Sequence, residues 1–158
     1  GNRFIRVFQR EEHFMFKKIL VPVDGSPTSL QAVSRAVALA KAFDGAVTAI
    51  YVIDPYPFTG VGTDFAYGQD QYLAAASAEA HDAIRVARES IEASGVAVDT
   101  RVVEAHSVWR GILDAASAME ADIVVMGSHG RHGIEKLLGS VAQRVLSHAH
   151  VPVMVVRD

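Results

Sequence analysis

Apolar and polar positions along this chain follow two alternating periods from Met15 onward. Short apolar runs of strand length recur at residues 17–23, 46–53, 96–103, 122–126 and 151–156. Between most of these runs, apolar residues return at steps of three and four, which is the period of a helix with one buried face. The pattern therefore predicts strands and helices in regular alternation.

Four helices are predicted, and turn residues bound several of them. The first follows the sequence DGSP at 24–27 and ends at Asp44-Gly45, and Gly95 closes the second. The third spans 109–119 and the last spans 140–148. The positions expected to face the core are Leu30, Val33, Val37 and Ala40, then Leu73, Ala76, Ala80, Ile84, Ala87 and Ile91, then Ile112, Ala116 and Met119. Residues 54–67, which contain two prolines and two glycines, are expected to form a loop.

Strands that alternate with helices pair in parallel through βαβ units, and strands apolar on both faces are covered by helices on both sides. The predicted fold is α/β: a five-stranded, doubly wound parallel sheet in one Rossmann-like domain. The alternating run at 96–103 and the terminal run from Val151 to Val156 are expected at sheet edges. Ligands of such sheets bind outside the carboxyl ends of the strands, which here are Asp24, residues 52–54 and Gly127.

Composition narrows the possible functions. The chain has 158 residues, no cysteine and a net charge of −3, and like charges do not form runs. This excludes disulfides and thiolate catalysis, and it argues against a duplex DNA or anionic membrane partner. No apolar stretch approaches the ~20 residues that cross a bilayer. Arginines interrupt the apolar residues of the first ten positions, so no signal peptide is expected and we expect a cytoplasmic protein.

Residues 1–14 differ in composition from the rest of the chain. We expect a domain at 15–158, and an N-terminal extension at 1–14 that is disordered or introduced by cloning. The alternative is an amphipathic arm that docks on a partner.

The strongest chemical signal is a glycine-rich stretch between the fourth strand and the last helix. Gly127, Gly130 and Gly139 would let the backbone approach a ligand closely, and the helix that begins at Ser140 would add unpaired amides that suit a phosphate. Arg131 could pair with a terminal phosphate. No Gly-Lys-Ser/Thr follows, so this is not a Walker loop. The alternative is a connection that uses glycine only for its turns.

These motifs resemble the universal stress protein family. The resemblance is carried by ILVPVDGS at 19–26, YVID at 51–54, VMGSHG at 125–130, GSV at 139–141 and VPVMVV at 151–156. It implies an adenine nucleotide α-hydrolase-like fold and the nucleotide-binding, glycine-loop branch of the family. It also implies a role in the stress response and a homodimer that pairs through the last strand.

The resemblance also implies a binding site for ATP, ADP or AMP. Asp24 would hold the ribose hydroxyls or the adenine side, or cap the first helix, and Pro22 and Val52 would lie beside the base. The glycines, His129, Ser140 and Val141 would contact ribose and phosphates, largely by main chain. The full predicted site is Pro22, Val23, Asp24, Val52, Met126, Gly127, His129, Gly130, Arg131, Gly139, Ser140 and Val141.

Two departures from the family pattern bear on this site. Eight residues separate Gly130 from Gly139 where the pattern has nine, which would either tighten the loop or misplace its donors. Ala105-His106-Ser107 stands where the family often has Gly-x-Pro.

Other chemistry is weakly indicated. The seven histidines lack zinc-ligand spacing, so we expect no metal site, and Mg²⁺ would arrive on nucleotide phosphates. Trp109 is expected to pack rather than to stack on a base. No catalytic residue is predicted and no obvious base would position water, so hydrolysis should be slow or absent. A protein partner is also expected, whose identity the sequence does not reveal. The alternatives are a nucleotide-free dimeric interaction module and a weak nucleotide hydrolase.

Overall fold

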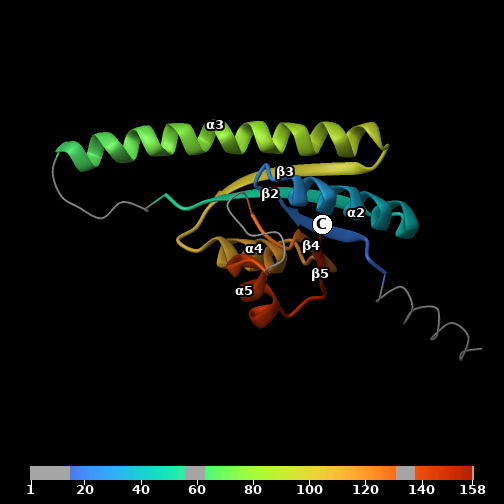
Figure 1. Ribbon diagram of the computed structural model, residues 1–158. Helices are drawn as coiled ribbons and strands as arrows, with labels where there is room; N and C mark the ends of the chain where they lie inside the picture. The colour runs from blue at the N-terminus through green and yellow to red at the C-terminus, as the bar shows by residue number, and fades with distance from the viewer. Residues whose placement is uncertain (1–14, 56–62, 131–137, 158) are drawn as a thin grey trace, which may run out of the picture.

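One parallel sheet carries the fold, in a computed structural model that describes residues 15–55, 63–130 and 138–157 (Figure 1). Its strand order is β3-β2-β1-β4-β5. The strands are β1 (Lys18–Pro22), β2 (Ala46–Ile53), β3 (Ala97–Glu104), β4 (Ile123–Gly127) and β5 (Val153–Val156). The helices are α2 (Pro27–Phe43), α3 (Thr63–Ala93), α4 (Val108–Ala118) and α5 (Ser140–His148). The predicted fold class is confirmed.

The direction of strand order reverses at β1. Lys18 and Pro22 of β1 pair with Ala46 and Ile50 of β2, and Leu20 also pairs with Val124 of β4. The chain therefore runs outward to β3 on one side and to β5 on the other, which confirms both predicted edge strands. The carboxyl ends of β1 and β4 lie at this switch point, where doubly wound sheets open a crevice.

Helices cover both faces of the sheet (Figure 1). Helices α2 and α3 pack on one face over a core that includes Ile19 and Val21 of β1, and α4 and α5 pack on the other over Leu20. Alternate residues of one strand therefore serve opposite cores. Within the described ranges, no helix is long and apolar enough to cross a bilayer.

Polar caps fix both ends of α2. The hydroxyl of Ser26 accepts a hydrogen bond from the Ser29 amide at 3.2 Å, and Pro27 starts the first turn. The helix ends at Asp44 in the left-handed region, with φ 54°. The cap is thus Ser26, and the alternative prediction that Asp24 caps this helix was wrong.

Several element ends are shifted by one residue from their predicted positions, and three further predicted details differ more widely. Leu30 is 42% exposed, because the buried face of α2 is centred on Ser29, Ala36 and Ala40, about 100° away around the helix. Helix α3 begins at Thr63, so residues 63–67 belong to a helix and not to a loop. Strand β5 begins at Val153, which leaves Val151 and Pro152 outside it. The predicted loop residues 56–62 and the extension 1–14 lie outside the described residues.

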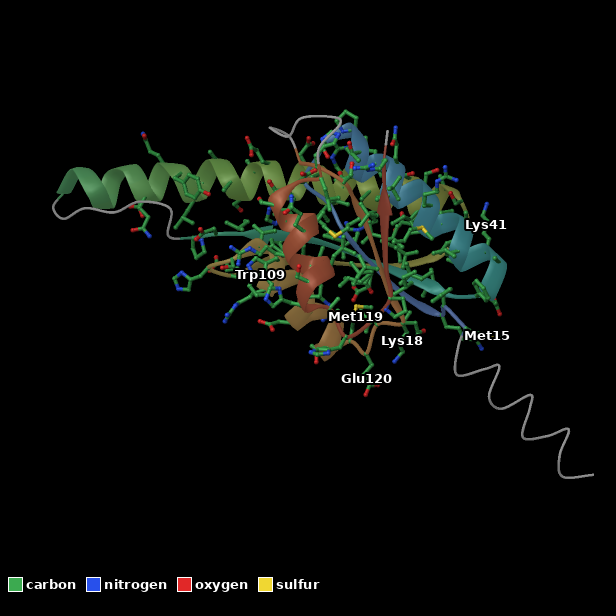
Figure 2. All side chains as sticks on the ribbon, turned by 60° about the horizontal axis from the view of Figure 1, so that its bottom comes forward. Met15, Lys18, Lys41, Trp109, Met119 and Glu120 are labelled. Atoms are coloured by element: carbon green, nitrogen blue, oxygen red, sulfur yellow. The ribbon has the colours of Figure 1, made fainter. Side chains whose placement is uncertain are left out.

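Asp122 holds the start of β1 at the amino-terminal ends of the strands. One carboxylate oxygen of Asp122 accepts hydrogen bonds from the amides of Lys17 and Lys18, at 2.9 and 2.8 Å. An exposed ion pair between Lys18 and Glu120 lies at the same edge (Figure 2). These contacts anchor the start of β1 at the end of the sheet opposite to the crevice.

Candidate functional site

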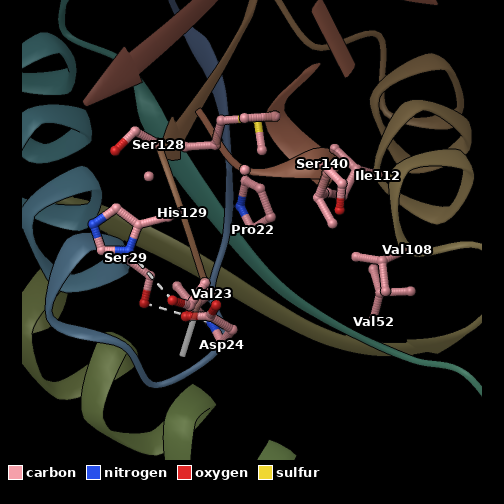
Figure 3. Close-up of a pocket in the computed structure, with 16 residues that line it drawn as sticks. Pro22, Val23, Asp24, Ser29, Val52, Val108, Ile112, Ser128, His129 and Ser140 are labelled. Carbon is pink, nitrogen blue, oxygen red and sulfur yellow. Dashed lines mark hydrogen bonds between the residues drawn. The ribbon is translucent and has the colours of Figure 1, made fainter. Parts of the chain in front are cut away.

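A cavity of about 460 Å³ opens at the carboxyl ends of β1, β2 and β4 (Figure 3). Its volume is in the usual range of small-molecule sites. The starts of α4 and α5 close its other side. The lining residues are Pro22, Val23, Asp24, Ser29, Val52, Val108, Ile112, Met126, Gly127, Ser128, His129, Gly130, Gly139, Ser140, Val141 and Ala142.

Eleven of the twelve predicted site residues lie along this cavity, and the twelfth, Arg131, lies outside the described residues. The five lining residues that were not predicted are Ser29, Val108, Ile112, Ser128 and Ala142. Ile112 was expected to face the core, and Val108 is one turn before it, so the start of that helix was an available signal. Nothing in the sequence pattern singled out Ser29.

One side of the cavity is apolar. Val52, Val108 and Ile112 gather there, with Pro22 toward the middle (Figure 3). Gly111 allows this packing, because a Cβ at that position would lie 2.8 Å from Cγ1 of Val52. Helix α4 therefore lies directly against the end of β2, and the two elements form a wall suited to the flat face of a base.

Asp24 provides a carboxylate on the opposite side (Figure 3). Its Oδ1 accepts a hydrogen bond from the Ser26 amide at 2.9 Å, and its own amide donates to the Ser29 hydroxyl at 3.5 Å. These two bonds fix the turn between β1 and α2. Its Oδ2 lies 2.8 Å from the position that a Cβ on Gly130 would take. The carboxylate thus faces the glycine loop.

The His129 ring lies against the start of α2. Its Nε2 is 3.3 Å from the hydroxyl of Thr28, and its Nδ1 donates to the carbonyl of Gly130 at 3.3 Å. Gly127 makes the close approach of α2 possible, since a Cβ there would be 2.8 Å from Cγ2 of Thr28. The first residues of the loop are therefore shaped by packing on α2.

The far end of the loop returns to the cavity despite its shorter spacing. The Gly139 amide donates to the carbonyl of Ser128 at 2.6 Å, and the Ser128 amide donates to Val156 at 2.9 Å. Gly139 is the N-cap of α5 and has no side chain to occupy the first amides of the helix. Ser140, Val141 and Ala142 all line the cavity. The start of α5 is thus placed where an anion would be stabilised by the helix dipole.

Ser128 contributes an unusual group to the wall. Its side chain is fully buried, and its hydroxyl has no hydrogen-bond partner among the described residues. Across the same residues, no group of three or more histidine, aspartate or glutamate side chains is arranged to hold a metal ion.

The fold and this cavity define a doubly wound α/β protein with a ligand pocket at its switch point. A model of the universal stress protein family matches residues 15–157, and the chain belongs to that family. Universal stress protein MJ0531 of Methanocaldococcus jannaschii is 39% identical over 144 residues, which cover 90% of this chain and 83% of that protein.

Solved structures agree with this assignment. Universal stress protein UspA from Lactobacillus plantarum superimposes with a TM-score of 0.80 at 28% identity, covering 90% of this chain and 98% of that one. A universal stress protein solved in complex with cAMP superimposes with a TM-score of 0.64 at 25% identity. The match covers 90% of this chain and 98% of that protein's chain. The resemblance seen in the sequence motifs is confirmed.

Proposed function

We propose that this protein binds ATP, or the closely related ADP or AMP, in the cavity at the switch point. It would act as a dimeric regulatory protein of the stress response in the cytoplasm, with slow or no hydrolysis. The observation that carries the proposal is the convergence of an apolar wall, a carboxylate and the start of α5 in one cavity of about 460 Å³.

Each part of the cavity suits one part of a nucleotide. The base would pack between Pro22, Val52 and Ile112, where its apolar faces would be buried away from water. The Asp24 carboxylate accepts hydrogen bonds only, which suits the ribose hydroxyls. The phosphates would lie along Gly127 and Gly130 and meet the amides of Ser140, Val141 and Ala142, with Mg²⁺ carried on the phosphates. Arg131 remains the predicted partner of a terminal phosphate.

The universal stress protein solved with cAMP supports the adenine nucleotide class. Binding assays should therefore include cAMP as a competitor. Its cyclic phosphate carries one negative charge where the ATP phosphates carry several, so the comparison separates recognition of the nucleoside from recognition of the phosphates.

Slow or absent hydrolysis follows from how the titratable groups at the cavity are already engaged. Oδ1 of Asp24 is bonded to the Ser26 amide, and the His129 ring is held between Thr28 and Gly130. The remaining oxygen of Asp24 would accept bonds from the ribose hydroxyls, so neither group would lie ready to position a water at the terminal phosphate.

The proposed dimer pairs two copies of β5 through the segment from Val151 to Val156. β5 is an edge strand, and an apolar edge is a liability unless it is covered. A twofold axis would let the same strand serve both subunits in antiparallel pairing.

Mass spectrometry of the ligand released from the purified protein tests the proposal. We expect ATP, ADP or AMP in the released fraction, and uptake of adenine but not guanine nucleotides by the emptied protein. If the protein carries no nucleotide and takes up none, the nucleotide-free interaction module becomes the better account. The shortened spacing between Gly130 and Gly139 is the feature that favours that alternative.

A further inference from the structure

A second hollow of about 370 Å³ lies beside the cavity, between the start of α4 and the first turns of α5. It is lined by Ser107, Val108, Trp109, Ser140, Val141 and Arg144. Val108, Ser140 and Val141 line the cavity as well. The two spaces therefore adjoin along these three residues, and we call the second the outer groove.

The polar groups of the outer groove all donate hydrogen bonds and carry no negative charge. Arg144 follows Ser140 by four residues, so the two lie on one face of α5, about 6 Å apart along its axis. Ser107 is the N-cap of α4, and its hydroxyl makes no bond to cap that helix. Among the residues that the structure describes, no acidic side chain lines the groove.

The Arg144 guanidinium forms no ion pair with another described residue, whereas Arg85 and Arg101 are paired with carboxylates. It is therefore a positive charge beside the shared residues that no described carboxylate neutralises. A guanidinium in this state binds phosphate oxygens through two charge-assisted hydrogen bonds.

Aromatic packing holds the wall of the groove in place. The Trp109 ring stacks on His148 with centroids 4.4 Å apart, and Nδ1 of His148 donates to the carbonyl of Arg144 at 2.8 Å. Trp109 thus lies where α4 meets α5 (Figure 2). The prediction that Trp109 packs rather than stacks on a base agrees with this contact.

We propose that the outer groove is a phosphate subsite of the nucleotide pocket, in which Arg144 contacts the phosphate farthest from the nucleoside. The inference rests on the proposed function and adds a specificity to it. A triphosphate that passes Ser140 would reach Arg144, and a monophosphate would end before it. Arg144 would therefore make the site prefer ATP to AMP.

The test is a set of ATP and AMP affinities for the full-length wild type, Arg144→Gln, Arg144→Lys and the control Arg110→Gln. Arg110 lies over the Trp109 ring, with its guanidinium carbon 5.1 Å from the ring centroid, and it does not line the groove. We expect Arg144→Gln to weaken ATP binding about tenfold and to leave AMP binding within about twofold. Arg144→Lys should restore part of the loss, and Arg110→Gln should change neither affinity.

The fluorescence of Trp109, which is the only tryptophan of the chain, gives a second readout. ATP should change it more than AMP does, because only ATP would enter the groove. Equal ATP and AMP affinities in the wild type, unchanged ATP affinity in Arg144→Gln, or equal losses for both nucleotides would overturn this inference alone. A wild type that binds no adenine nucleotide would overturn the proposed function as well.

Discussion

The two faces of the sheet are built for different purposes. Helices α2 and α3 are 17 and 31 residues long, and they bury Ile19 and Val21 of β1, and Val23 directly after it, under a continuous core. Helices α4 and α5 have only 11 and 9 residues, and both begin at the carboxyl edge of the sheet. The short pair leaves the cavity open beside Pro22, on the opposite side of the same strand. The comparison indicates that both faces hold a core, and that the face under α4 and α5 also opens into the site.

Deleting a core side chain on each face should separate these purposes most strongly. Ile91 of α3 and Ile112 of α4 are 0% and 1% exposed. We expect Ile91→Ala and Ile112→Ala each to lower the free energy of unfolding by about 2–5 kcal/mol. Only Ile112→Ala should also weaken ATP binding, since only Ile112 lines the cavity. Urea denaturation and calorimetry measure the two effects. Equal losses of ATP affinity in both variants would show that the faces are not separable.

The two glycines at the start of the loop sharpen the same comparison. Among the described residues, a Cβ on Gly130 would meet only Oδ2 of Asp24, so Gly130→Val should weaken nucleotide binding more than about tenfold and alter folding little. A Cβ on Gly127 would strike Thr28 of α2, so Gly127→Ala should cost about 1–3 kcal/mol of stability. Thermal melts and ATP titrations of both variants test this. If Gly130→Val folds and binds ATP normally, the loop is only a connector.

A charged residue introduced in β5 should prevent dimerisation. Val155 packs partly against the core under α4 and α5, so Val155→Thr serves as a control of similar size without a charge. We expect the wild type and Val155→Thr to be dimers at tens of micromolar and Val155→Lys to be a monomer, because the pairing would bury a charge. Light scattering, with circular dichroism to check folding, gives the answer. A monomeric wild type refutes the dimer, and a dimeric Val155→Lys variant places the interface elsewhere.

The smallest effect is expected from removing residues 1–14. The start of β1 is held by the bonds of Lys17 and Lys18 to Asp122, which a chain beginning at Met15 retains. Solubility, dimerisation and ATP affinity should therefore be unchanged, as size-exclusion chromatography and calorimetry can establish. Loss of any of the three would show that this segment is a functional arm.

Much of the fold could be predicted from the chain because local pattern and burial agree. The strand at Ala46–Ile53 and the helix at Ser140–His148 have the predicted bounds, since Gly45 and Asp54 flank the strand and Gly139 precedes the helix. Parallel pairing followed from βαβ alternation, and the two edge positions followed from the patterning of those strands. The predicted pocket residues came together because parallel strands end at one edge.

The remaining errors have tertiary causes. Leu30 keeps the helical period but is exposed, because the start of α2 packs Thr28 against Gly127 and buries Ser29 instead. Helical periodicity alone does not tell which of the neighbouring positions on a helix faces the sheet. Ser29, near the start of α2, and Ser128, directly after β4, line the cavity, which their positions in the sequence pattern do not reveal.

Calorimetric titration of the full-length protein with ATP and Mg²⁺ tests nucleotide binding at the switch point most directly. We predict one site per chain with a dissociation constant in the micromolar range, on the order of −8 kcal/mol for a one-micromolar site. We also predict a rise in the melting temperature at saturating nucleotide, since a ligand that binds only the native state stabilises it. No heat and no thermal shift at millimolar ATP would contradict nucleotide binding by this protein.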